Sequence, residues 1–313
     1  MATRVILDVD TGLDDAVALL VAATSPDLDL VGVTVVNGNC PCPVATENTL
    51  RVFDAAGVAG IPVYAGMHAP LVRPSFERDQ PSFQNVYLPL PAATSRARED
   101  HAVDYLVRTL KESAGDITLI AVGPLSNIAA ALLLEPRLVE KIPRLVIMGG
   151  GHDAGNVTPA AEFNIWVDPE AARVVFKAGM PITLLPLDAT YQALVTVEDV
   201  ERLRATGSPP ARVAAEAMSL LLRAYEGRMP REGAPVHDAL AVCAAIDPSI
   251  ITTAHVHVDV EVRGELTSGR TVCDFYRRGS GAPNADVAVW ADERAFVRLL
   301  ESVLGASAQP RDT

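Results

Sequence analysis

Apolar runs that end in polar or glycine-containing turns recur along this chain of 313 residues. Residues 5–7, 28–36, 117–122 and 145–148 form four such runs, and helical patterns follow the first three. The alternation predicts an α/β fold over residues 1–313, a single domain with a mostly parallel central sheet flanked by helices. Ligands bind beyond the carboxyl ends of strands in such sheets, so we expect the four turns to meet at one crevice.

The first of these turns is crowded with carboxylates, with four acids in eight residues: Asp8, Asp10, Asp14 and Asp15. Like charges held this close repel one another unless a bound cation or a raised pKa relieves the conflict. Gly12 permits a sharp turn, after which a helix is predicted over residues 16–23. Oxygen ligands favour Ca²⁺ or Mg²⁺, whereas the segment has no cysteine or histidine for Zn²⁺. The alternative is that the acids only complement the helix dipole and cap the turn.

The overall charge restricts the class of partner. The chain has 26 basic and 39 acidic residues, which gives a net charge of −13 and argues against nucleic acid or an anionic membrane as the main partner. A small neutral or cationic ligand fits better. The sequence shows no secretory signal and no apolar run long enough to span a bilayer, so we expect a cytoplasmic protein.

Residues 66–95 lack any hydrophobic period and carry five prolines. This composition predicts a long irregular loop, either a lid over an active site or a surface excursion. Further along, Asp168 precedes Pro169 and is expected to cap a helix. Residues 255–262 alternate strictly, which predicts one strand whose polar face, including His255 and His257, is solvated; a metal site on that face is the alternative.

The acid stretch and the following Val36-Asn37-Gly38-Asn39 resemble the signature of the inosine–uridine-preferring nucleoside hydrolases. Further segments appear in the family's order and approximate spacing: Gly123-Pro124-Leu125-Ser126-Asn127, Met148-Gly149-Gly150-Gly151, Ala161-Glu162-Phe163-Asn164, Asp168-Pro169-Glu170-Ala171-Ala172 and Val236-His237-Asp238-Ala239. The resemblance covers nearly the whole chain. It implies a Rossmann-like nucleoside hydrolase fold and calcium-dependent hydrolysis of ribonucleosides to free base and ribose.

The resemblance also implies roles for individual residues. Asp10, Asp15 and Asp238 match the family's Ca²⁺-binding carboxylates, and Val122 matches a residue that contributes its backbone carbonyl. Asp10 also matches the acid that takes a proton from the metal-bound water. The positions that match groups holding the ribose hydroxyls are Asp14, Asn39, Asn156, Glu162 and Asn164. Met148 matches a residue that packs beside the sugar.

The reaction chemistry is consistent with these residue types. Cleavage of an N-glycosidic bond needs an activated water on one side of the ribose and neutralisation of the departing base on the other. Amide and acid side chains recognise hydroxyls, which predicts a preference for ribose over deoxyribose.

Two residues near the base have open interpretations. His237 matches a histidine near the leaving base, and it either protonates the base or only orients Asp238. Tyr225 is a candidate for contact with the base, or an ordinary half-buried helix residue. Residues 75–83 depart from a histidine- and glycine-containing stretch of many relatives, so the base pocket is expected to differ. Relatives are commonly dimers or tetramers, which predicts a homodimer or homotetramer.

Two rival functions remain at this stage. The segment Asp8-Val9-Asp10-Thr11-Gly12 also resembles the nucleophile motif of haloacid-dehalogenase-like phosphatases, but the later strand ends offer no matching lysine. A non-catalytic nucleoside or sugar binder on the same scaffold is the second rival, and the intact Asp10 favours turnover over it.

Overall fold

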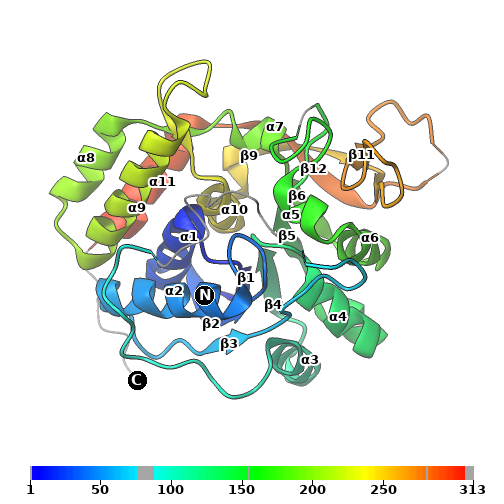
Figure 1. Cartoon of the computed structure of the whole chain (residues 1–313), viewed down its shortest axis with the longest axis horizontal. Helices are drawn as coiled ribbons and strands as arrows, with labels where there is room; N and C mark the ends of the chain where they lie inside the picture. Colours follow the sequence, from blue (N-terminus) through cyan, green and yellow to red (C-terminus); the bar gives the residue numbers. More distant parts are fainter. Residues whose placement is uncertain (1, 76–87, 154, 280, 307–313) are drawn as a thin grey trace.

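A computed structural model describes residues 2–75, 88–153, 155–279 and 281–306. Within these residues eight strands form one twisted sheet, and Figure 1 shows helices on both of its sides. From one edge to the other the strands are β3 (Val63–Ala65), β2 (Leu28–Val35), β1 (Thr3–Val9), β4 (Ile117–Ala121), β5 (Leu145–Met148), β6 (Ile182–Leu185), β12 (Ala285–Ala291) and β9 (Ile251–Val256). Neighbouring strands run parallel except β9, which is antiparallel to β12. The predicted mostly parallel α/β fold is confirmed.

Alternation along β1 explains the two cores. Val5, Leu7 and Val9 point to one side of the sheet and Ile6 to the other, so each face of this central strand is apolar. The first face packs against α1 (Leu13–Thr24), α2 (Cys42–Ala56), α7 (Leu187–Thr190), α8 (Val197–Ala205), α9 (Pro209–Tyr225), α10 (His237–Ile246), η2 (Pro248–Ile250) and α11 (Glu293–Gly305). The second packs against α3 (Ala102–Glu112), α4 (Ser126–Leu134), η1 (Pro136–Lys141), α5 (Phe163–Val167) and α6 (Pro169–Lys177).

Two predicted helix starts can be compared directly with the structure. Helix α6 begins at Pro169, and the Asp168 carboxylate accepts the Ala171 amide at 3.0 Å, so the predicted cap is confirmed. Helix α1 begins at Leu13 rather than at residue 16. It starts earlier because the Asp15 carboxylate accepts the Gly12 amide at 2.8 Å and closes the first turn.

The predicted single strand over residues 255–262 is wrong. The segment is divided between β9, which belongs to the main sheet, and β10 (Val258–Val260), which pairs with β11 (Thr271–Cys273). His257 lies between them, and its carbonyl accepts the Asp274 amide at 2.8 Å. Of the predicted solvated face, His255 is exposed and pairs with Asp286 at 2.9 Å, whereas His257, Asp259 and Glu261 are half-buried.

The long loop is described only at its two ends. Residues 66–75 and 88–101 contain no helix or strand apart from a bridge at Arg98, as the composition predicts. Residues 76–87, including most of the atypical 75–83 stretch, lie outside the described residues. A two-stranded pair, β7 (Leu194–Val195) and β8 (Ala234–Pro235), completes the strands described. None of the described helices has the length and apolar character needed to cross a bilayer.

Candidate active site

A cavity of about 310 Å³ opens beyond the carboxyl ends of the central strands. Ten of the predicted site residues line it: Asp14, Asn39, Val122, Met148, Asn156, Glu162, Asn164, Tyr225, His237 and Asp238. Asp10 and Asp15 are fully buried beside the lining acids. The volume of the cavity falls in the range of small-molecule sites, so the cavity can enclose a ligand the size of a nucleoside.

Three buried carboxylates meet at one side of this cavity. One oxygen from each of Asp14, Asp15 and Asp238 lies within 4.8 Å of the others, a spacing that can hold a metal ion. The start of α1 supplies two of these acids and the start of α10 supplies the third. Asp15 is held by the Asp10 amide at 3.1 Å, the Gly12 amide at 2.8 Å and the Asn39 side chain at 3.3 Å. Backbone amides therefore fix the direction of its carboxylate.

Asp10 lies directly beside this group. One of its oxygens, Oδ2, accepts the hydrogen bond of the Asn39 backbone amide at 2.5 Å. The other, Oδ1, is buried and accepts no hydrogen bond from the described residues, and the same holds for Oδ1 of Asp14. The backbone at Gly38 lies close to the Asp10 carboxylate, because a Cβ on Gly38 would lie 2.1 Å from Asp10 Oδ2. Only glycine fits at position 38 without displacing Asp10.

The electrostatics of the acids are unfavourable without a cation. Burial, with repulsion from Asp15, raises the pKa of Asp10 well above its ordinary value and that of Asp14 to about 7. Burial and repulsion from Asp14 raise the pKa of Asp238 in the same way. A hard divalent cation would offset the burial and the mutual repulsion of these acids and satisfy the unpartnered oxygens of Asp10 and Asp14, so the residues present fit such an ion.

Asp8, the fourth acid of the stretch, makes separate contacts. Its Oδ1 accepts the Thr34 hydroxyl at 2.5 Å and the Asn127 side chain at 2.8 Å. Burial raises its pKa to about 7, although both hydrogen bonds act in the opposite direction. Asp8 therefore connects β1 to β2 and α4 beneath the site.

The predicted carbonyl ligand, Val122, is in contact with a predicted ribose-binding residue. Asn164 Nδ2 donates to the Val122 carbonyl at 2.8 Å and to the Met148 carbonyl at 3.2 Å. A carbonyl oxygen has two lone pairs, so Val122 keeps capacity for a second interaction. Asn164 joins the ends of β4 and β5 at the wall of the cavity.

Glu162 and Asn156 organise the loop that leads to Asn164. Glu162 caps α5 by accepting the amides of Asn164 at 2.9 Å and Ile165 at 3.2 Å, and it also accepts the Gly150 amide at 2.8 Å. Burial raises its pKa to about 7, although these amide contacts lower it. Asn156 Oδ1 accepts the Phe163 amide at 2.9 Å. Both side chains thus line the cavity from backbone-fixed positions.

His237 and Tyr225 lie together at the cavity wall. The Tyr225 hydroxyl is 3.2 Å from His237 Nε2, and the Thr190 hydroxyl is 2.7 Å from Nδ1. Tyr191 packs edge-on against the same imidazole, with ring centroids 5.3 Å apart. Complete burial lowers the pKa of His237 to about 4, so the ring is neutral at pH 7.

Sequence reasoning missed several residues of the site. Six additional residues line the cavity: Leu13, Val157, Phe163, Leu221, Ala224 and Arg228. Leu221 precedes Tyr225 by one helical turn and could have been found from that spacing. Arg228 and Thr190 lie in or beside turns, where no periodic signal identifies them.

A second group could also hold a metal. His152, Asp153 and Asp188 each offer one atom within 4.8 Å of the others. Asp188 is already engaged, because its oxygens accept the amides of His152 at 2.8 Å and Asp153 at 3.1 Å. Asp153 is exposed, so this group has the properties of a loop-fixing turn.

Comparison with known proteins shows the family of the chain. Residues 5–298 match the model of the family described as inosine-uridine preferring nucleoside hydrolase. The chain belongs to the inosine-uridine preferring nucleoside hydrolase family. Within it, the chain is 39% identical over 303 residues to the pyrimidine-specific ribonucleoside hydrolase RihB of Escherichia coli strain SE11, covering 95% of this chain and 96% of the relative. It is 40% identical to RihA of E. coli O9:H4, strain HS, covering 96% and 97%.

Solved structures of nucleoside hydrolases share the fold. A purine-preferring ribonucleoside hydrolase from Gardnerella vaginalis superposes with a TM-score of 0.88 at 32% identity, covering 96% of this chain and 98% of that one. A plant nucleoside hydrolase, PpNRh1, gives 0.89 at 32% identity, covering 98% and 100%. The chain is an N-glycosyl hydrolase of ribonucleosides. Both rivals, the phosphatase and the non-catalytic binder, are therefore set aside.

Proposed function

We propose that this enzyme hydrolyses ribonucleosides with the aid of one Ca²⁺ ion held by Asp10, Asp15, Asp238 and the Val122 carbonyl. The observation that carries the proposal is the group of buried carboxylates of Asp14, Asp15 and Asp238 beside a nucleoside-sized cavity, with Asp10 next to it. One oxygen each of Asp10 and Asp14 lacks a hydrogen-bond partner among the described residues. When bound, the ion would neutralise the acids and acidify a water molecule.

Asp10 is the residue proposed to accept the proton of the attacking water. Its Oδ2 accepts the Asn39 backbone amide and its Oδ1 accepts no hydrogen bond from the described residues, so the carboxylate keeps free lone pairs both for the ion and for this proton. Asp15 has both oxygens held by amides and is suited to a fixed, non-transferring role.

The ribose is proposed to lie between the acids and the loop of residues 156–164. Asp14 and Asn39 contact its hydroxyls from one side, while Asn156, Glu162 and Asn164 do so from the other. Met148 packs beside the sugar. All six residues line the same cavity, and several are fixed by backbone hydrogen bonds, so the hydroxyls would meet preorganised partners.

The departing base is proposed to meet the pair of Tyr225 and His237. These side chains line the cavity and contact each other at 3.2 Å, which supports a shared role in supplying a proton or hydrogen bond to the base. A neutral histidine fits a role as a relay between Tyr225 and Thr190 better than one as a standing positive charge.

For the base itself, we propose pyrimidine ribonucleosides as the preferred class, because the relatives at 39–40% identity are named pyrimidine-specific. The Gardnerella vaginalis enzyme, a structural neighbour at 32% identity, is named purine-preferring. The competing outcome is therefore faster hydrolysis of purine ribonucleosides than of pyrimidine ribonucleosides. Calcium, the cytoplasmic location and the dimeric or tetrameric assembly stay predictions.

A substrate panel tests the proposal. Release of reducing sugar is measured for uridine, cytidine, inosine and adenosine, each with its 2′-deoxy analogue, before and after treatment with a calcium chelator. We expect turnover of the ribosides, with uridine or cytidine fastest, a loss of at least about tenfold on the deoxy analogues, and loss of activity in chelator that added CaCl₂ restores. Full activity after complete metal removal would contradict the calcium proposal.

A further inference from the structure

Helix α2 carries a fully buried asparagine, Asn48, that touches two separate segments of the chain. Its Nδ2 donates to the Thr11 carbonyl at 3.1 Å. Thr11 lies in residues 10–15, the turn after β1 together with the first residues of α1, a segment that we call the acid loop. Its Oδ1 accepts the Leu88 amide at 2.9 Å. One side chain thus joins the acid loop to the segment of residues 88–95.

The orientation of this amide follows from its partners. The Leu88 backbone N–H can only donate and the Thr11 carbonyl can only accept, so oxygen must face the first and nitrogen the second. Cys40 lies at the same point, with its sulfur 3.9 Å from Asn48 Nδ2 and 3.8 Å from the Thr11 carbonyl. An apolar replacement at position 48 would remove the acceptor of the Leu88 amide and leave the Thr11 carbonyl with only the weak Cys40 thiol donor.

Thr11 occupies a sensitive position in the acid loop. It separates Asp10 and Gly12, whose two amides hold the Asp15 carboxylate. Its hydroxyl is 2.7 Å from that of Thr49, which itself donates to the Ala45 carbonyl at 2.9 Å, so Thr11 is the donor of the pair. Two consecutive residues of α2 therefore fix the peptide on which the placement of Asp15 depends.

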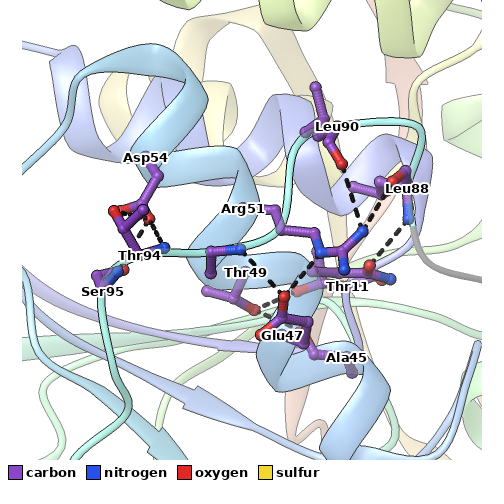
Figure 2. Close-up of polar contacts among 12 residues, drawn as sticks. Thr11, Ala45, Glu47, Thr49, Arg51, Asp54, Leu88, Leu90, Thr94 and Ser95 are labelled. Atoms are coloured by element: carbon purple, nitrogen blue, oxygen red, sulfur yellow. Dashed lines mark hydrogen bonds and ion pairs between the residues drawn. The ribbon is translucent and has the colours of Figure 1, made fainter.

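The same helix fastens the 88–95 segment at further points, shown in Figure 2. Arg51 donates to the carbonyls of Leu88 at 3.5 Å and Leu90 at 3.3 Å, and pairs with Glu47 at 2.8 Å. Glu47 also accepts the Ala93 amide at 3.1 Å. Farther along α2, Asp54 accepts the Thr94 hydroxyl at 2.8 Å and the Ser95 amide at 3.0 Å.

We propose that Asn48 is a positioning residue that couples docking of the 88–95 segment to the geometry of the acid loop and thereby to its affinity for a divalent cation. This inference rests on the proposed function, since it takes the acid loop to be part of the cation site. Asn48 itself touches neither cation nor substrate. It acts through the Thr11 carbonyl, and a change at either end of the contact alters the other.

Calcium binding to the metal-free enzyme provides the first test. Titration calorimetry with CaCl₂ is performed on the unaltered chain, on Asn48→Ala and on Arg51→Gln, which loosens the 88–95 segment without touching the acid loop. We expect Kd to rise about tenfold in Asn48→Ala and severalfold in Arg51→Gln, within the usual range of coupling between sites. Circular dichroism establishes that each variant is folded, and Arg51→Gln alone suffices if Asn48→Ala does not fold.

Tyr105→Phe is the matched control. It also removes a hydrogen bond of a largely buried side chain, that of the Tyr105 hydroxyl to the Val31 carbonyl at 3.0 Å, but on the other face of the sheet. We expect its Kd for Ca²⁺ to equal that of the unaltered chain. If Asn48 had only a structural role, Asn48→Ala and Arg51→Gln would both lower the melting temperature and leave the Kd for Ca²⁺ unchanged. That result would overturn the inference.

Hydrogen exchange tests the coupling in the reverse direction. Because coupling is reciprocal, addition of Ca²⁺ should slow hydrogen exchange of the Leu88 amide severalfold in the unaltered chain. In Asn48→Ala, addition of Ca²⁺ should not change the exchange rate of this amide. Ca²⁺ binding without any effect on Leu88 would overturn the coupling while the calcium proposal stands. Absence of Ca²⁺ binding to the unaltered chain would overturn both, so the two failures are distinguishable.

Discussion

The Tyr225 hydroxyl lies 3.2 Å from Nε2 of His237, inside the cavity that is proposed to receive the base. Thr190 Oγ1 donates to the Leu187 carbonyl at 3.3 Å and can then accept the hydrogen of His237 Nδ1. In that arrangement Nε2 is an acceptor and the Tyr225 proton points toward it. A bound base would compete with the imidazole for that proton.

Replacing Tyr225 with phenylalanine tests this relationship. We expect Tyr225→Phe to lower kcat on uridine or inosine about 10²-fold, the lower end of general acid contributions. The aryl substrate p-nitrophenyl riboside departs without a proton, so its kcat should fall much less. Steady-state kinetics on both substrates measure the contrast. Equal losses on the two would show that Tyr225 only shapes the cavity.

The role of Asp10 as the base makes a second prediction. Asp10→Asn keeps the shape of the side chain and an oxygen for the Asn39 amide but cannot take a proton. We expect kcat to fall about 10²- to 10⁴-fold while the Kd for substrate, measured by calorimetry, changes only severalfold. Asp153→Asn, in the exposed second acid group, is the control and should keep full activity. A kcat within about tenfold of the parent for Asp10→Asn would rule out the role.

Gly38 offers a steric test of the same residue. In Gly38→Ala the new Cβ would lie 2.1 Å from Asp10 Oδ2 and 2.8 Å from Pro124, so the turn or Asp10 must move. We expect a loss of about 1–3 kcal/mol in the free energy of unfolding, as for other overpacked sites, together with a large loss of activity. Urea unfolding and ribose release measure the two quantities.

Gly115→Ala is the control for this steric effect. Gly115 has a φ of 81°, and no heavy atom lies within 4 Å of the position that an added Cβ would take, so its replacement strains the backbone without contacting the site. A loss of about 1 kcal/mol in stability is expected with unchanged activity per folded molecule. Normal activity in Gly38→Ala would show that Asp10 tolerates displacement.

The attachment of residues 94–95 to α2 has a defined pH dependence. Although partial burial acts to raise it, hydrogen bonds from Ser95 and Thr94 lower the pKa of Asp54 from 3.8 to about 2. A carboxyl whose pKa is lower in the folded than in the unfolded state stabilises the folded protein at pH values above its unfolded-state pKa. This stabilisation is lost as the pH falls through its folded-state pKa. The Asp54 contribution is therefore complete above about pH 5 and disappears between about pH 4 and 2.

Comparison with Asp54→Asn isolates this contribution. At pH 7 the variant should be less stable by about 1 kcal/mol, the usual value of such hydrogen bonds, and the difference should shrink toward pH 2. Urea unfolding of both proteins across this pH range measures it. A difference that is constant with pH would show that the charge of Asp54 has no part in holding the segment.

The fold could be predicted because its strands are short apolar runs with clear ends. β5 begins and ends as predicted, and the ends of β1, β2, β4 and β5 do converge on one cavity, through Asp14, Asn39, Val122 and Met148. The polar residues of the turn at 123–127 do not line it. The failure at residues 255–262 has a simple cause: strict alternation indicates a strand but does not specify its partner. β9 and β10 share the alternation yet pair in different sheets.

The candidate site was predictable in part. The acids of the first turn stand out by charge alone, but Asp238 lies far along the chain and is identified only through the family resemblance. Thr190 and Arg228 were missed because single residues in or near turns carry no pattern that separates them from background. Asn48 was missed for another reason: a buried asparagine inside a helix looks like any polar helix residue until its partners are known.

Asp14 and Asp15 meet Asp238 although more than two hundred residues separate them in the chain. During synthesis Asp14 and Asp15, at the start of α1, therefore emerge long before the aspartate that completes the group. The nascent enzyme cannot acquire its full complement of carboxylates until α10 has left the ribosome and packed beside α1, which makes closure of this site a late event in folding.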